Sequence, residues 1–127
     1  MPDPSTYDYA VIRLVPQVER DEFVNVGVIL CCPAQNFAEA RIHLDEARIL
    51  ALYPKLDLDS IRTHLEAIPR ICAGDPASGP IAKLSQRERF LMLVAPRSTV
   101  IQPSPVHTGI CQSPAATLDR LMESQVL

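Results

Sequence analysis

The stretch that decides the fold runs from Glu22 to Pro33 and reads EFVNVGVILCCP. Apolar side chains occupy both parities of this run, which is typical of a central strand that is covered on both faces of its sheet. One parity is uniformly apolar and is expected to meet helices: Val24, Val26, Val28, Leu30 and Cys32. The other parity contains the polar Asn25 and the side-chain gap of Gly27, so we expect any chemistry of the sheet on this second face.

A second central strand precedes this one. Residues 7–15 are largely apolar on both parities, and Arg13 is embedded in them. A short polar connection leads from here to the 22–33 strand, and two strands so close in sequence most simply pair as an antiparallel hairpin. Such a hairpin would place Arg13 near Asn25.

The remaining segments predict an α+β domain. In order, they are a half-exposed strand (37–44), a short helix (45–52), a longer helix from Asp57 or Asp59 to Gly74, a loop (74–83), a helix from Ser85 to Pro96, an edge strand (99–102) and a last helix from Ser113. Residues 90–95 also fit a strand, and Pro69 is expected to kink or end the longer helix. We predict a flexible lead-in (residues 1–6) and a single α+β domain (residues 7–127), with an antiparallel sheet of about four strands and helices mainly on one face.

Composition narrows the classes of function. The chain has 127 residues, enough for one core, and a formal net charge of -3, which disfavours nonspecific nucleic-acid binding. No apolar run reaches the roughly 18 residues that a membrane helix needs, so no membrane association is expected. Two of the four cysteines, Cys31 and Cys32, are adjacent, and no secretion signal stands at the start. We therefore expect reduced cysteines in a cytoplasmic protein.

Arg13 and Asn25 form the first candidate site, because both are polar groups inside runs that otherwise read as buried. A buried guanidinium needs a partner. Either the two side chains face a shared polar pocket beside Gly27 that accepts an anion, or Arg13 is structural and is satisfied by carboxylates such as Glu22.

The second candidate site is the proline-rich segment of residues 95–109. Its polar side chains include Arg97, Ser98, Thr99 and His107. Prolines preset an extended backbone, so these groups would be held for binding at little cost in conformational entropy. The alternative is that the hydroxyl groups only cap turns beside the prolines.

The sequence indicates no metal site, cofactor or catalytic nucleophile. The histidines at 43, 64 and 107 and the four cysteines show no pair with the spacing of a zinc knuckle. A thiol in the middle of an apolar strand has a raised pKa and is a poor nucleophile. No catalytic residue is assigned.

Four stretches together resemble an uncharacterised bacterial family, domain of unknown function 3037. They are residues 7–13, the 22–33 strand, residues 84–89, and residues 95–109 with their STVIQPSPVHTG run. The resemblance spans nearly the whole chain, except that the cysteine pair and residues 110–113 depart from the pattern. It implies no activity, cofactor or catalytic residue. It does imply an accessory protein, because relatives look like companions of genes for kinases similar to the HipA toxin kinase.

These observations predict a non-catalytic binding or accessory module for a protein partner, such as a HipA-like kinase, or for an anionic ligand. The alternative is a small enzyme that acts on a phosphorylated or nucleotide-like substrate. In that version Arg13 and Arg97 clamp the anion, His107 is the general acid or base, and Asn25 or Ser98 orients the substrate. Self-association through the edge at residues 99–106 also stays open, although its prolines blunt that edge.

Overall fold

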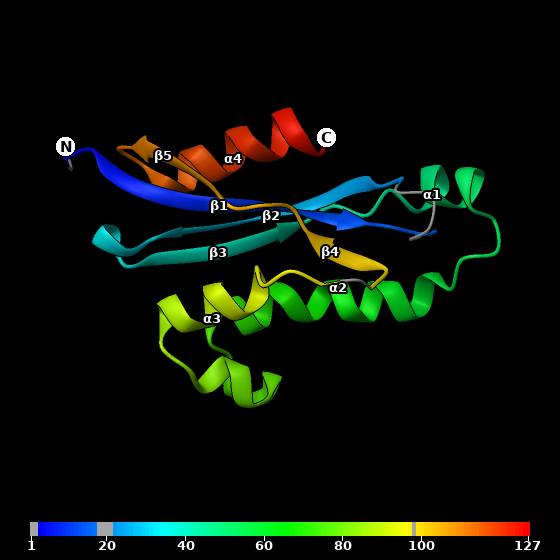
Figure 1. The fold of residues 1–127 in the computed structure, drawn as a ribbon, viewed down its shortest axis with the longest axis horizontal. Helices are drawn as coiled ribbons and strands as arrows, with labels where there is room; N and C mark the ends of the chain where they lie inside the picture. The colour runs from blue at the N-terminus through cyan, green and yellow to red at the C-terminus, as the bar shows by residue number, and fades with distance from the viewer. Residues whose placement is uncertain (1–2, 18–21, 98) are drawn as a thin grey trace.

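The fold is a five-stranded antiparallel sheet with helices on both of its faces (Figure 1). A computed structural model describes residues 3–17, 22–97 and 99–127. Within them the strands are β1 (Ser5–Leu14), β2 (Val24–Cys32), β3 (Phe37–Ile42), β4 (Ile101–Pro103) and β5 (His107–Cys111). The α-helices are α1 (Glu46–Leu52), α2 (Leu58–Ala73), α3 (Gln86–Leu93) and α4 (Pro114–Gln125), and the 3-10 turns are η2 (Pro33–Gln35), η3 (Pro76–Ser78) and η4 (Pro80–Lys83).

The strand order is β3-β2-β1-β4, and β5 pairs with the first half of β1. All these pairs are antiparallel. The predicted antiparallel α+β architecture is therefore confirmed, with five strands in place of about four.

A separate hydrophobic core lies on each face of the sheet. Helices α1, α2 and α3 contribute to the first core, whose buried residues include Ala10, Ile12, Leu14, Ile29, Cys31, Ile49, Ile61, Leu65 and Phe90. Helix α4 forms the second core with Tyr7, Val28, Leu30, Cys32, Leu118, Leu121 and Met122. Figure 1 shows α2 and α4 on opposite sides of the strands. The described helices thus lie mainly on one face, as predicted, and α4 covers the other.

The β1–β2 hairpin contains a register shift. Ile12 pairs with Gly27. The next residue of β1, Arg13, pairs with Asn25, so Val26 is an extra residue in β2. This arrangement is a β-bulge, and the extra residue reverses which face each later side chain of the strand occupies.

The bulge corrects the predicted faces of β2. Val24 and Val26 pack with the α2-side core, although they share sequence parity with the residues that face α4. Asn25 turns to the α4 face instead, and its Nδ2 donates to the carbonyl O of Gln125 at 2.9 Å. The polar side chain of β2 therefore lies on the face opposite to the one that strict alternation predicts.

The α-helices begin at the capping side chains that the sequence offers. Asp45, Asp57, Ser85 and Ser113 each accept a hydrogen bond from the backbone N–H three residues further on. Helix α3 continues to Leu93, so most of residues 90–95 are helical rather than extended.

Pro69 does not end α2, which continues to Ala73 and stops at Gly74 in the left-handed conformation. A proline removes one backbone donor from a helix. The buried stripe of α2 extends beyond it to Cys72, and burial of that last turn explains why the helix goes on.

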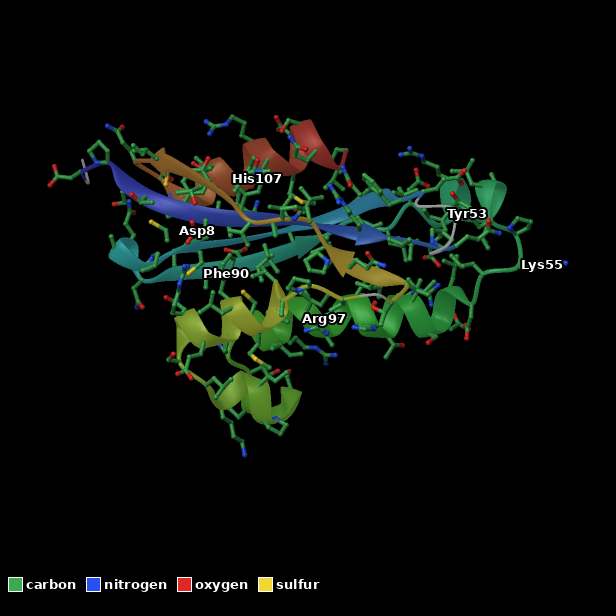
Figure 2. All side chains as sticks on the ribbon, viewed as in Figure 1. Asp8, Tyr53, Lys55, Phe90, Arg97 and His107 are labelled. Carbon is green, nitrogen blue, oxygen red and sulfur yellow. The ribbon has the colours of Figure 1, made fainter. Side chains whose placement is uncertain are left out.

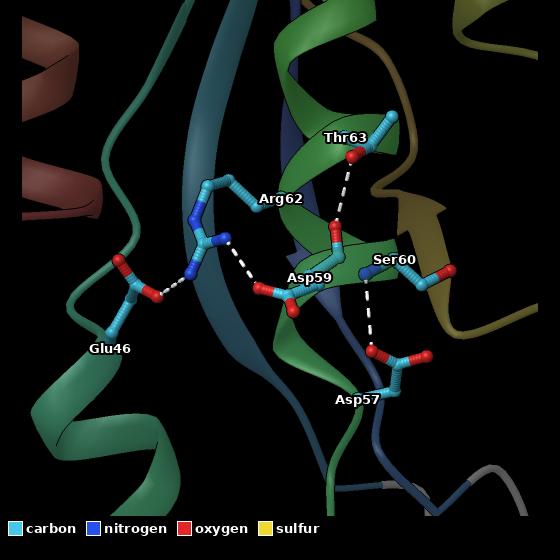
Figure 3. A network of polar contacts seen from close by, with 6 residues as sticks. All are labelled: Glu46, Asp57, Asp59, Ser60, Arg62 and Thr63. Carbon is cyan, nitrogen blue, oxygen red and sulfur yellow. Dashed lines mark hydrogen bonds and ion pairs between the residues drawn. The ribbon is translucent and has the colours of Figure 1, made fainter.

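Arg62 joins α1 to the first turn of α2 (Figure 3). Its guanidinium forms ion pairs with Glu46 of α1 and, at 2.8 Å, with Asp59 Oδ1. Hydrogen bonds to Glu46 and then to Asp59 raise the pKa of Arg62, so the link stays charged at any physiological pH.

The segment predicted to be a rigid polar loop contains a strand. Residues 107–111 form β5, which pairs with residues 5–9 of β1. Because Ser5 pairs with Cys111, the sheet begins inside the predicted lead-in, two residues before the expected domain start at Tyr7. The long β1 supports both pieces of an interrupted edge, which a local pattern does not reveal.

Ser104 replaces a strand residue at this interruption. Its backbone N–H donates to the Val11 carbonyl at 2.8 Å, and the Val11 N–H donates to Ser104 Oγ, also at 2.8 Å. The hydroxyl in turn donates to the carbonyl O of Pro105 at 2.9 Å. The side chain thus satisfies a backbone donor where the chain turns away from β1.

The Ser104→Ala variant is expected to lose about 1–3 kcal/mol of unfolding free energy, because it leaves the buried Val11 N–H without an acceptor. Urea unfolding followed by circular dichroism measures this change. Ser60→Ala, at an exposed position of α2, is the matched control and should stay within about 0.5 kcal/mol of the unaltered chain. Equal losses in the two variants would show that the Ser104 hydroxyl has no such role.

Candidate functional site

A groove lies between α2 and the segment that leads into β4. Its inner part is a partly enclosed cavity of about 80 Å³ against the sheet, and an open part of about 390 Å³ borders the start of α2. Both parts are lined by His64 and Ile101, so they adjoin. We call the two together the α2 groove.

The inner cavity is apolar except for two side chains. Its lining consists of isoleucines, Leu93, Ala67 and Pro103, together with His64 and Arg97. Ligand pockets usually have apolar walls with few polar groups and volumes of about 300–1,000 Å³, so a ligand would occupy the inner cavity together with the open part of the groove.

Helix periodicity places His64 in the groove. It follows Ile61 by three residues and precedes Ile68 by four, and both of these isoleucines belong to the buried stripe of α2. His64 therefore lies on the flank of the stripe, exposed to solvent but next to the sheet. In the sequence this histidine stands out only as a possible metal ligand, although its position beside the stripe is visible there.

Arg97 is held by the end of α3. Its Nη2 donates to the carbonyl O of Met92 at 2.9 Å. The last carbonyls of a helix lack helical partners, and a guanidinium satisfies them well. The Arg97 guanidinium has five N–H donors, and among the described residues the Met92 carbonyl is its hydrogen-bond acceptor. Most of its donors are therefore available to a ligand.

Thr99 borders the open part of the groove. Its Oγ1 donates to the Ile101 carbonyl at 2.7 Å, and its carbonyl accepts from Gln102 Nε2 at 2.7 Å. The hydroxyl thus stabilises the turn, as in the alternative that the sequence left open. Ser98 lies outside the described residues.

Arg13 and Asn25 are neighbours, as the hairpin predicted, but they lie on the α4 face. The Cζ atom of Arg13 is 4.1 Å from the ring centre of Phe23, an arrangement that favours a cation–π interaction. Within the described residues, the buried atoms Arg13 Nε and Asn25 Oδ1 have no hydrogen-bond partner. The two side chains therefore share a location without bonding to each other.

His107 lies on β5, with its ring 5.3 Å from the ring of Tyr9. Tyr9 and Arg13 are four residues apart on β1, a separation of about 13 Å at the usual rise of a strand. Figure 2 shows His107 on the α4 side of the strands and Arg97 on the α2 side.

The described candidate residues thus form three separate groups rather than one site. They are Arg13 with Asn25, His107 alone, and Arg97 with Thr99. The predicted enzyme needs Arg13, Arg97 and His107 around one substrate, but the sheet separates Arg97 from the other two, and His107 lies beside Tyr9, four residues along β1 from Arg13.

The cysteines are poor nucleophiles. All four are free and buried. Burial raises the pKa of Cys72 to about 12 and also raises the pKa of Cys32. These two thiols are therefore protonated at neutral pH.

No group of three or more His, Cys, Asp or Glu side chains among the described residues is arranged to hold a metal ion. None of the helices in this part of the chain combines the length and apolar character that crossing a bilayer requires.

The model of a family described as "Protein of unknown function (DUF3037)" matches residues 9–126. No curated protein and no solved structure matches the chain.

Proposed function

The chain belongs to the DUF3037 family of proteins of unknown function, and we propose that it is a non-catalytic binding module for an anionic group. One observation carries the proposal: His64 and Arg97 are the polar residues of an otherwise apolar cavity. A guanidinium binds carboxylate and phosphate oxygens through two parallel hydrogen bonds. The ligand would place its anion at Arg97 and His64.

The apolar part of the groove indicates the rest of the ligand. Burial of apolar area contributes about 25 cal/mol per Å². The acidic residue of the groove, Asp57, is engaged as the N-cap of α2 and borders only the open part, away from the inner cavity. An anion that carries a short apolar chain therefore suits the groove better than a cation or a fully polar ion.

Two sources can supply this chemistry, a small molecule and an acidic side chain or phosphate of a partner protein. A group on a partner protein agrees with the accessory role that the family resemblance implies. A HipA-like kinase as that partner stays a prediction. Four free cysteines support a location in the bacterial cytoplasm, because disulfides are rare there.

Octanoate is a suitable probe, and calorimetric titration at pH 7 measures its binding. We expect Arg97→Gln to weaken octanoate binding by about 10-fold or more, as the loss of a charged hydrogen bond predicts. Glutamine keeps an N–H donor for the Met92 carbonyl, so α3 should keep its end. Arg120→Gln, at an exposed position of α4, is the control and should bind octanoate unchanged.

Octylammonium distinguishes the proposed anion site from a merely apolar groove, since it has the same alkyl chain length as octanoate and the opposite charge. Equal binding of octanoate and octylammonium, or unchanged octanoate binding by Arg97→Gln, would contradict the proposal. Isolation of the native protein without any partner or ligand, combined with turnover of a substrate, would contradict its non-catalytic character.

A further inference from the structure

The two edges of the sheet differ. β4 and β5 together form one edge along β1, and Pro103 at the end of β4 and Pro105 just after it hinder the pairing of another strand across this interrupted edge. β3 forms the other edge, and among the described residues it pairs only with β2. β3 spans six residues and contains no proline, and its outer backbone groups have no partner strand among the described residues.

The register identifies those outer groups. The His43 N–H donates to the carbonyl O of Val26 at 2.7 Å, which directs His43 towards β2. Backbone groups alternate in direction along an antiparallel strand. Residues 39 and 41 therefore point to β2 as well, and the N–H and C=O groups of Ala38, Ala40 and Ile42 point outward.

A groove of about 660 Å³ runs along this edge. Residues 40–42 of β3 and the following His43 line it, together with Glu66 and Pro69 of α2 and Asp119, Met122 and Glu123 of α4. Helices α2 and α4 lie on opposite faces of the sheet, so they form two walls with the strand edge between them (Figure 1).

The charges of the two walls are unbalanced. Arg41 forms an ion pair with Asp119 and lies 3.3 Å from a carboxylate oxygen of Glu39. No ion pair with another described residue is present for Glu66 or Glu123. Each wall therefore presents one unpaired carboxylate, one on either side of the strand edge.

We propose that β3 accepts an extended basic segment of a partner protein as a sixth strand. Side chains of an added strand alternate between its faces, so basic residues of opposite parity reach Glu66 on one wall and Glu123 on the other. Backbone hydrogen bonds to Ala38, Ala40 and Ile42 hold the segment. A single extended segment fits between the walls, whereas a second copy of this chain would bring its own two helices to the same edge.

Amide hydrogen exchange by NMR tests the strand addition directly. The probe is the peptide acetyl-Thr-Lys-Val-Val-Lys-Thr-amide, whose two lysines have opposite parity. In the free protein the amides of the partly exposed Ala38 and Ile42 should exchange fast, while those of Glu39 and Arg41, which point to β2, are protected. Saturation with the peptide should slow exchange at Ala38 and Ile42 by about 10-fold or more, as new ladder hydrogen bonds predict.

Two sets of variants test the parts of the proposal. The Glu66→Gln/Glu123→Gln double variant should weaken peptide binding by about fivefold, the effect of losing exposed charge pairs, whereas Asp3→Asn should leave it unchanged. Ala38→Pro removes an outward donor without removing a hydrogen bond to β2, and it should weaken binding by about 10-fold or more. The peptide with glutamate in place of both lysines should bind more weakly than the lysine peptide.

Three outcomes would overturn the inference. The first is peptide binding without protection of the outward amides, which would indicate attraction between charges alone. The second is no binding of the lysine peptide to the unaltered chain. The third is protection of the outward amides in the chain alone, with a doubled mass in solution, which would assign the edge to a second copy.

Discussion

The Gly27→Ala variant is expected to lose about 3 kcal/mol of unfolding free energy, because the added methyl group has no space. A Cβ atom at Gly27 would lie 2.5 Å from the carbonyl O of Arg41 and 2.7 Å from Ile42 Cδ1. Both distances are shorter than real Cβ contacts, so β3 would have to move away from β2. Urea unfolding followed by circular dichroism measures the loss.

A double variant separates the clash with the Arg41 carbonyl from the clash with the Ile42 side chain. Ile42→Val removes Cδ1 and leaves the Arg41 carbonyl in place. Ile42→Val alone should lose about 1 kcal/mol or less. In the Gly27→Ala/Ile42→Val background the large destabilisation should remain, because the backbone carbonyl is the closer atom. Full rescue by Ile42→Val would show that side-chain crowding alone explains the need for glycine.

Phe90→Ala is expected to lose about 3–5 kcal/mol, as for other large-to-small changes in a core. Phe90 is 1% exposed and belongs to the core between the sheet and α2. A domain of this kind has about 5–15 kcal/mol of total stability, so this one change removes a large share of it. The α2 groove should be disturbed as well, because the Met92 carbonyl at the end of α3 holds Arg97 in place. Thermal and urea unfolding measure the loss of stability.

The neighbouring Leu91 provides the control. Its side chain is 50% exposed on the same helix, and Leu91→Ala should change stability by about 0.5 kcal/mol or less. If the two alanine variants lost similar amounts of stability, the assignment of Phe90 to the core would be wrong.

The candidate site was only partly predictable. The hairpin correctly brought Arg13 to Asn25, because adjacent strands with a short connection usually pair. The bulge at Val26 moved the Asn25 side chain to the other face of the sheet. No local sequence pattern indicates one extra residue in an apolar run. The α2 groove combines Arg97 with His64, 33 residues earlier in the chain, so its composition depends on how α2 packs against the sheet.

Strand β5 shows a second limit of sequence patterns. Residues 107–111 are mostly exposed, so they lack the apolar alternation that indicates a strand. They become a strand because β1 is long enough to pair with β4 at one end and with β5 at the other. His107 consequently lies beside Tyr9 on the sheet rather than in a loop.

Local interactions explain the features that the amino-acid order alone establishes. These features depend on groups that lie within a few residues of one another. They are the helix starts at Asp45, Ser85 and Ser113, the end of α2 at Gly74, and the buried central strands. The free edge of β3, the α2 groove and the partner of Asn25, which is 100 residues away, depend on packing between distant segments. Hydrogen bonds and periodicity act over a turn or a strand, whereas the choice of face, edge and neighbour is made only when the whole sheet has formed.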